Sequence, residues 1–82
     1  MVKNRSFTED FAKIYSKLDK GFKTTVDKTI NKIIRNPGLG KPLGYNLAGM
    51  RSERIGKYRI LYEIKDDTVV FHTFKHRKKA YR

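Results

Sequence analysis

Apolar residues in the first half of the chain recur with the period of an amphipathic helix. One run is spaced at i, i+3, i+4 and i+7: Phe11, Ile14, Tyr15 and Leu18. Its start is marked either by Thr8 as an N-cap or by Ser6 and Glu9 as a capping box. The pattern is interrupted at Gly21 and stops before Asn36-Pro37-Gly38, with a second run between them: Phe22, Val26, Ile30 and Ile33. The sequence therefore predicts two helices that form an antiparallel hairpin.

In the second half of the chain the period falls to two, as in a strand with one apolar face. The alternation is clearest over eight residues: Tyr58, Arg59, Ile60, Leu61, Tyr62, Glu63, Ile64 and Lys65. The dipeptide Gly56-Lys57 turns this strand back on residues 48–55. Asp66-Asp67 makes the next turn, and residues 69–74 form a third strand rich in β-branched and aromatic side chains.

Two segments fall outside these patterns. Residues 36–46 hold three Gly and two Pro, so we expect a surface loop with little packing of its own. Residues 2–7 are a candidate further strand, although only Val2 and Phe7 are apolar there. The prediction is a single α+β domain over residues 1–82, in which a two-helix hairpin packs on a twisted antiparallel β-sheet of three to four strands.

The chain carries a strong positive charge, with 20 Lys and Arg against 8 Asp and Glu and a formal net charge of +12. Such a field attracts polyanions, and the alternative interpretation is a heavily solvated surface of a heat-adapted protein. Residues 1–44 and 45–82 each carry 10 basic and 4 acidic side chains, so net charge locates no site. Cysteine is absent, which excludes disulfides and thiolate metal sites. With no apolar run near the ~20 residues of a membrane span, we expect a cytoplasmic protein without membrane contact.

Several short segments together resemble the RelE/ParE toxin superfamily, the toxin halves of bacterial and archaeal toxin–antitoxin pairs. In chain order these segments are Asn36-Pro37, Gly40-Lys41-Pro42-Leu43, Leu47-Ala48-Gly49, residues 54–62, His76-Arg77 and Tyr81. The combination of the hairpin with His-Arg and a tyrosine four residues later carries the resemblance, since no single segment is decisive. A clear apolar strand at the N-terminus, usual in the superfamily, is missing.

The resemblance implies a fold, an activity and a partner. Members of the RelE branch are ribosome-dependent endoribonucleases, or mRNA interferases, that cleave mRNA in the ribosomal A site without a metal and inhibit translation. The implied partner is a cognate acidic antitoxin of the RelB-like type. Carried over by position, the implied catalytic residues are Arg54, Arg59, Arg77 and Tyr81. A further basic residue of the superfamily falls on Ser52, and Arg51 beside it points to the opposite strand face.

Metal-free RNA cleavage needs the 2′-hydroxyl to attack its own phosphate, a proton donor for the leaving 5′-oxygen, and positive charge on the phosphorane. Arg59 and Arg77 supply that charge through planar, permanently charged forks, with Arg54 in support. His76 and Tyr81 are candidates for proton transfer, and Tyr81 is also a candidate for stacking on a base. Further basic residues are expected to contact RNA: Arg51, Lys57, Lys75, Lys78, Lys79 and Arg82.

A metal site is not expected. On one strand His72 and His76 would lie about 13 Å apart at ~3.3 Å per residue, too far to share an ion. Asp66-Asp67 is explained by turn chemistry, and the carboxylates form no cluster. We therefore expect no metal and no cofactor. Tyr58 and Tyr62 share a strand face with apolar neighbours and are expected in the core rather than in stacking on RNA.

Two other functions compete with RNA cleavage. Members of the ParE branch of the same fold poison DNA gyrase by binding and need no catalytic residues. The basic and aromatic C-terminus favours the nuclease, because a gyrase-binding protein does not need His, Arg and Tyr there. A plain nucleic-acid-binding module is the third alternative, for which the sequence offers no recognition helix.

Overall fold

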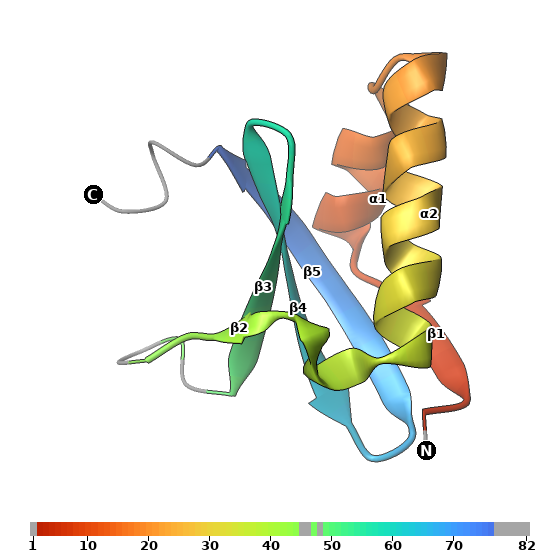
Figure 1. Ribbon diagram of the computed structural model, residues 1–82. Coiled ribbons are helices and arrows are strands. Elements are labelled where there is room, and N and C mark those ends of the chain that lie inside the picture. Colours follow the sequence, from red (N-terminus) through yellow and green to blue (C-terminus); the bar gives the residue numbers. More distant parts are fainter. Residues whose placement is uncertain (1, 45–46, 48, 77–82) are drawn as a thin grey trace.

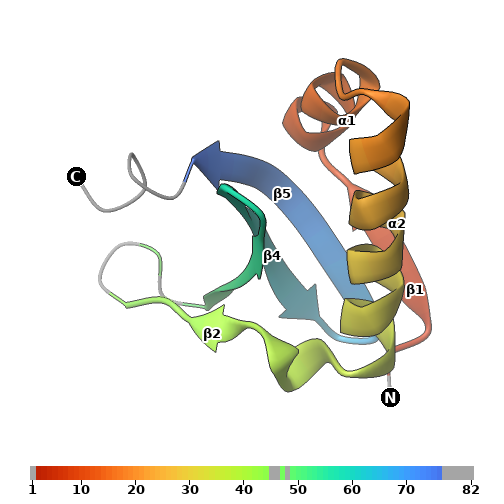
Figure 2. The same cartoon turned by 45° about the horizontal axis from the view of Figure 1, so that its top comes forward.

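Two helices pack on one side of a five-stranded sheet whose strand order is β1-β5-β4-β3-β2 (Figure 1). The structure is a computed structural model and describes residues 2–44, 47 and 49–76. Its elements are β1 (Asn4–Phe7), α1 (Glu9–Ser16), α2 (Lys20–Arg35), a short 3₁₀ helix (Pro37–Leu39), β2 (Lys41–Pro42), β3 (Met50–Ile55), β4 (Tyr58–Lys65) and β5 (Thr68–His76). Turned by 45°, the molecule still shows both helices on one side of a curved sheet (Figure 2). The predicted α+β class is confirmed.

Side-chain caps decide where both helices begin. The Thr8 hydroxyl accepts a hydrogen bond from the amide of Phe11 at 3.1 Å, so Thr8 is the N-cap of α1. Asp19 caps α2 in the same way, through the amide of Phe22 at 2.8 Å. The interruption expected at Gly21 is therefore at Asp19, and Gly21 lies in the first turn of α2. A capping carboxylate, rather than the flexibility of glycine, separates the two helices.

The core fills the space between the helix pair and the sheet. Its buried side chains come from both helices and three strands: Phe11, Val26, Ile30, Ile33, Ile55, Ile60, Tyr62, Val69, Phe71 and Phe74. Tyr62 is fully buried, as predicted. The prediction that Tyr58 also lies in the core is wrong, because this residue, at the start of β4, is 38% exposed. Tyr15 and Asp27 tie the helices together with a 2.8 Å hydrogen bond, which raises the pKa of the Tyr15 phenol above its ordinary value.

The sheet differs from the predicted antiparallel arrangement at both edges. β1 pairs in parallel with β5, so residues 2–7 do contain a strand and the sheet is mixed. This edge strand has four exposed residues and is anchored by Phe7, whose ring stacks on Phe11 and Phe71 at 5.4 Å between centroids in each case. At the other edge β2 pairs with β3 and raises the count to five strands. Neither edge strand shows an apolar period, because neither buries a whole face.

The two predicted hairpins are confirmed. β3 and β4 pair across Gly56-Lys57, where Gly56 has φ +60°, a left-handed conformation that glycine adopts without steric cost. β4 and β5 pair across Asp66-Asp67, and Asp66 has φ +53°, which aspartate tolerates better than most residues. β5 runs beyond the predicted residues 69–74 at both ends. The register of these hairpins decides which polar side chains share a sheet face.

Candidate functional site

Three cationic side chains form a row across the sheet face that points away from the helices. Arg54 of β3 is directly opposite Arg59 of β4, and Arg59 is directly opposite Lys75 of β5. Each is a chain neighbour of a buried core residue, so strand alternation places all three on the other face. Arg54 and Lys75 are exposed, and Arg59 is half-buried. The fold thus brings together three predicted site residues, which we call the cation row.

The like charges of the cation row repel one another across the paired strands. Directly opposite residues of an antiparallel pair have Cα atoms about 4.5–5.5 Å apart, and like charges in such positions destabilise the pairing. A polyanion lying over the row would relieve this repulsion and accept charge-assisted hydrogen bonds from the arginines. The row is therefore suited to hold phosphate groups.

Ser52 positions the central arginine of the row. Its hydroxyl accepts a hydrogen bond from Nη1 of Arg59 at 3.2 Å, and Ser52 is only 2% exposed. The contact is diagonal across the β3–β4 hairpin, since Ser52 is directly opposite Leu61. Sequence reasoning treated Ser52 only as a missing basic residue. Counting the register outward from the turn at residues 56–57 would have indicated this contact.

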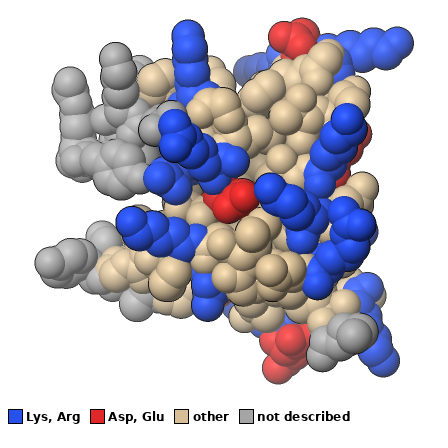
Figure 3. All heavy atoms as spheres, viewed as in Figure 1, with Lys and Arg blue, Asp and Glu red and all other residues tan. Residues whose placement is uncertain are grey.

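Further positive charge surrounds the row. Lys57 occupies the exposed turn between β3 and β4, next to the Arg54–Arg59 end of the hairpin. In the space-filling view, basic side chains are spread over both the helix side and the sheet side of the molecule, and acidic atoms are visible in only a few places (Figure 3). The positive field therefore covers more than the row and does not by itself define the site's limits.

Arg51 lies apart from the cation row. It is directly opposite the buried Tyr62, which puts it on the helix side of the sheet, as strand alternation predicted. Its Nη1 donates to the carbonyl of Gly40 at 2.7 Å and to that of Gly38 at 3.3 Å. Arg51 was predicted to contact RNA. In the structure its guanidinium holds the segment before β2 through these two hydrogen bonds.

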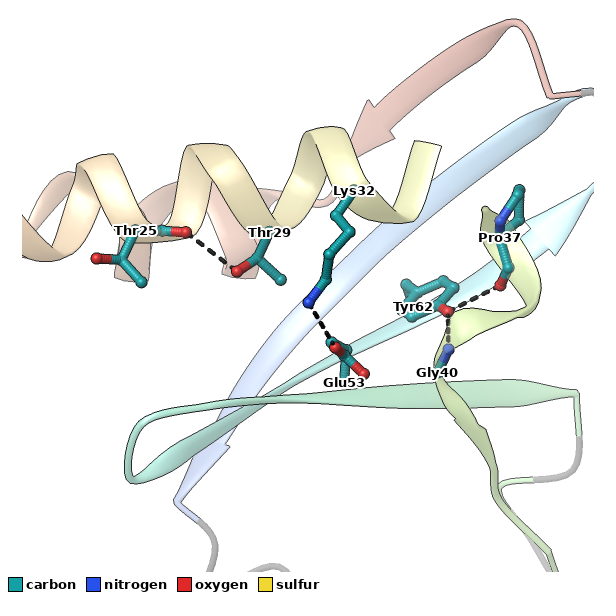
Figure 4. A network of polar contacts seen from close by, with 7 residues as sticks. All are labelled: Thr25, Thr29, Lys32, Pro37, Gly40, Glu53 and Tyr62. Atoms are coloured by element: carbon teal, nitrogen blue, oxygen red, sulfur yellow. Dashed lines mark hydrogen bonds and ion pairs between the residues drawn. The ribbon is translucent and has the colours of Figure 1, made fainter. Parts of the chain in front are cut away.

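Tyr62 is the second anchor of that segment. Its hydroxyl donates to the carbonyl of Pro37 at 2.8 Å and accepts a hydrogen bond from the amide of Gly40 at 2.8 Å (Figure 4). Burial raises the pKa of this phenol, and the Gly40 amide opposes that shift. A Cβ on Gly40 would lie 2.5 Å from the Tyr62 oxygen, so only glycine fits. The prediction that this loop makes few contacts of its own is wrong here, because the side chains of Tyr62 and Arg51 form hydrogen bonds with its backbone.

His76 is also separated from the row. It is directly opposite Tyr58, and the two rings meet edge to face at 5.4 Å with an interplanar angle of 81°. Because Tyr58 also contacts Phe22 of α2, this pair lies on the helix side of the sheet. The remaining predicted site residues lie outside the described residues: Arg77, Lys78, Lys79, Tyr81 and Arg82.

A titratable pair on the face of the cation row was not predicted. Nε2 of His72 lies 2.6 Å from Oε1 of Glu63. Sequence reasoning treated His72 only as a possible metal ligand, and the irregularity in β5 that directs it toward Glu63 has no signal in the residue pattern. Within residues 2–44, 47 and 49–76, no group of three or more His, Cys, Asp or Glu is placed to hold a metal ion.

Comparison with known families decides the identity of the chain. A family model described as ParE toxin of type II toxin-antitoxin system, parDE, matches residues 3–81. The protein belongs to this family. It is thus a type II toxin of the RelE/ParE superfamily, as the resemblance of its segments indicated. Neither helix in the described part of the toxin has the length and apolarity needed to cross a membrane.

Known relatives of this toxin agree with that assignment. Toxin RelG of Mycobacterium tuberculosis (strain ATCC 25618 / H37Rv) is 50% identical over 46 residues, which are 54% of this chain and 53% of the relative. The toxin therefore spans about half the length of the curated relative it matches. A chain of the RelBE2 toxin–antitoxin complex from Mycobacterium tuberculosis is 34% identical with a TM-score of 0.81, covering 94% of this chain and 100% of that chain.

More distant solved structures share the fold. A chain of the intact E. coli RelBE toxin–antitoxin complex is 16% identical with a TM-score of 0.76, covering 89% of this chain and 94% of that chain. A chain of the YoeB dimer from Staphylococcus aureus is 25% identical with a TM-score of 0.75, covering 93% of this chain and 98% of that chain.

Proposed function

We propose that this toxin is an endoribonuclease that cleaves messenger RNA in the ribosomal A site and thereby inhibits translation. The observation that carries the proposal is the cation row on the sheet face away from the helices, with Arg59 held by the buried hydroxyl of Ser52. Similarity to Toxin RelG and to chains of RelBE and YoeB structures supports the RelE-like branch.

In the proposed reaction the 2′-hydroxyl of one nucleotide attacks the adjacent phosphorus and expels the 5′-oxygen of the next nucleotide. The hydroxyl loses its proton to a base, the 5′-oxygen gains one, and a 2′,3′-cyclic phosphate and a 5′-hydroxyl result. Arg59 stabilises the charge of the phosphorane, while Arg54 and Lys75 hold neighbouring phosphates. Arg77 is proposed as the second arginine on the phosphorane.

Proton transfer is assigned to His76 and Tyr81 in this proposal. An imidazole can both donate and accept a proton, so His76 is suited to exchange protons with the 2′-hydroxyl or the 5′-oxygen. Because its ring stacks edge to face against Tyr58, it would have to leave that contact to reach an RNA over Arg59. Tyr81 is proposed as the other group that exchanges a proton with the RNA. Neither step requires a metal or a cofactor.

The proposed partner is an acidic, RelB-like antitoxin. A net charge of +12 on 82 residues favours an acidic protein that neutralises or displaces the positive site. Chains similar to this toxin occur in the RelBE2 complex of Mycobacterium tuberculosis and the YoeB–YefM complex of Staphylococcus aureus. Co-expression with the product of the adjacent gene should yield a complex that survives moderate salt, and failure of any acidic neighbour to bind would contradict this part of the proposal.

A ParE-like action on DNA gyrase is the second candidate, favoured by the description of the matching family model. Such a toxin would bind gyrase without cleaving RNA and would not need the cation row for chemistry. Two assays on the same purified protein separate the candidates. One maps breaks in messenger RNA in a translating extract, and the other measures supercoiling by gyrase.

The sharpest test of the nuclease replaces Arg59 with Ala. Loss of one charge-assisted transition-state contact costs about 3–4 kcal/mol, so cleavage should fall by about two to three orders of magnitude. The matched control is Arg35→Ala, which removes an equally long cation from the exposed last turn of α2. Equal cleavage by wild type and folded Arg59→Ala would refute the role of Arg59.

The chemistry has its own test, independent of any protein variant. A messenger with a 2′-deoxy nucleotide at the scissile position lacks the proposed nucleophile and should resist cleavage. Cleavage should continue in excess EDTA once ribosomal magnesium is accounted for, and the products should carry a 5′-hydroxyl. A metal-activated water would instead leave a 5′-phosphate. Normal cutting of the 2′-deoxy substrate would show that the proposed reaction is wrong.

A further inference from the structure

A β-bulge in β5 places an additional side chain on the face of the cation row. Leu61 is directly opposite Thr73, while the next residue, Tyr62, is directly opposite Phe71, so His72 is the extra residue of β5. Bulges insert one residue into a strand, change the direction of its side chain, and are frequent beside functional sites. Here the result is that His72 turns toward Glu63 of β4.

The Glu63–His72 pair is held in place from several sides. Nε2 of His72 lies 2.6 Å from Oε1 of Glu63, and the side chains are 34% and 22% exposed, respectively. The backbone carbonyl of His72 accepts a 2.6 Å hydrogen bond from the hydroxyl of Thr8, the N-cap of α1. Lys65 approaches the same Glu63 oxygen at 3.9 Å. Oε2 of Glu63 has no hydrogen bond or ion pair within the described part of the chain and is available to an outside donor.

The surroundings of the pair suit a nucleobase rather than a phosphate. Met50 and Val70 are directly opposite Glu63 on the two neighbouring strands, and both are half-buried. These apolar side chains offer van der Waals contact to a flat base, whereas the Glu63 carboxylate repels a phosphate. Glu63 also lies four residues from Arg59 on the same sheet face, about 14 Å away at ~3.4 Å per residue. One RNA strand can therefore cover both places.

We propose that Glu63 and His72 form a base-reading subsite that favours adenine, cytosine or guanine over uracil. The proposal rests on the nuclease function proposed above. An ionised carboxylate only accepts hydrogen bonds, and these three bases carry an exocyclic amino group that donates. Uracil has no amino group, and its single ring N3–H lies between two carbonyl oxygens whose lone pairs are repelled by the carboxylate. His72 positions Glu63 and offers a planar ring for stacking.

The test is the Glu63→Gln variant, because a glutamine side chain keeps the shape and adds a donor for uracil carbonyls. Purified wild type and variant are added to a translating extract, and messenger breaks are mapped by sequencing at single-nucleotide resolution. The wild type should cleave poorly at sites that have uracil at one fixed position relative to the scissile bond. For Glu63→Gln, the ratio of cuts with uracil at that position to cuts with adenine, cytosine or guanine there should rise about tenfold. A factor of this size corresponds to the discrimination given by one oriented hydrogen bond.

The matched control is Glu53→Gln. Glu53 is also a half-buried carboxylate of this sheet, with 18% side-chain exposure and a 3.4 Å ion pair to Lys32, but it lies on the helix side. Its removal should leave the base preference unchanged. A second variant, His72→Phe, keeps a planar ring and removes the contact that positions Glu63, so it should weaken the discrimination against uracil without abolishing cleavage.

The outcomes separate this inference from the proposed function. If wild type cuts no messenger, the nuclease proposal fails and the base-reading subsite fails with it. If wild type cuts but folded Glu63→Gln keeps the wild-type cleavage map, or loses all cuts in equal proportion, only the subsite is refuted. A change of map that Glu53→Gln reproduces would also refute it, because a general effect of charge would then be the cause.

Discussion

Replacing Tyr62 with Phe removes a single oxygen from the core and leaves the ring in place. In the wild-type toxin that oxygen accepts a hydrogen bond from the buried amide of Gly40 and donates one to the carbonyl of Pro37, both at 2.8 Å. The variant thus removes both hydrogen bonds by which Tyr62 holds the segment between α2 and β2 (Figure 4). Arg51 continues to hold the same segment through two carbonyls, so the native fold should persist.

The size of the effect follows from these contacts. A buried donor left without an acceptor costs about 1–3 kcal/mol, and the second lost hydrogen bond adds about 0.5–1.5 kcal/mol. We therefore expect a loss of about 2–4 kcal/mol in the free energy of unfolding. In a domain of this size about 1 kcal/mol lowers Tm by ~4–8 °C, so a fall of at least about 8 °C should be measured.

The pH dependence gives this prediction a second readout. Burial raises the pKa of Tyr62 in the folded toxin above its ordinary value of 10.0. The phenol's contribution to stability is therefore complete below pH 10.0 and is lost as pH rises through the folded-state pKa. Denaturant unfolding at neutral pH and at several values above 10.0 should show the difference between wild type and Tyr62→Phe shrinking with pH.

The control for this experiment is Tyr58→Phe, which removes the hydroxyl of a tyrosine that is 38% exposed. It should change the free energy of unfolding by less than about 0.5 kcal/mol, as surface substitutions usually do. The reasoning is refuted if Tyr62→Phe is as stable as wild type at neutral pH. It is also refuted if the difference between the two proteins stays constant as pH rises above 10.0.

Three further substitutions test other contacts through the midpoint of thermal or denaturant unfolding. Thr8→Ala removes the α1 cap at 3.1 Å and the 2.6 Å bond to β5, and should cost about 1–2 kcal/mol; an unchanged midpoint would contradict the capping role. Gly40→Ala places a Cβ 2.5 Å from the Tyr62 oxygen and should cost about 1–3 kcal/mol, whereas Gly44→Ala, whose Cβ meets no atom within 4 Å, should be nearly neutral. Lys32→Met breaks the 3.4 Å ion pair between the exposed Lys32 of α2 and the half-buried Glu53 of β3 and should cost less than about 1 kcal/mol; a larger loss would mean that the pair is poorly screened.

The residue pattern alone predicts those elements of this toxin that bury a full face. Both helices, the three central strands and the two hairpin turns follow from periods of 3.6 and 2, because burial of one face imposes such a period on the sequence. The same alternation assigns Arg59 and Arg51 to opposite sheet faces, and the structure agrees. The sequence also indicated membership of the RelE/ParE superfamily, because the segments that carry the resemblance are short and occur in a characteristic order.

Only the tertiary structure decides the features that depend on contacts between distant segments. β1 and β2 are edge strands formed by backbone hydrogen bonds, which leave no apolar pattern in the sequence. The β-bulge that joins His72 to Glu63 inserts one residue into a strand without changing its composition. Ser52 reaches Arg59 because of the hairpin register, and Tyr62 holds Gly40 across 22 residues. Such contacts arise when the chain packs in three dimensions, and periodicity in one dimension does not encode them.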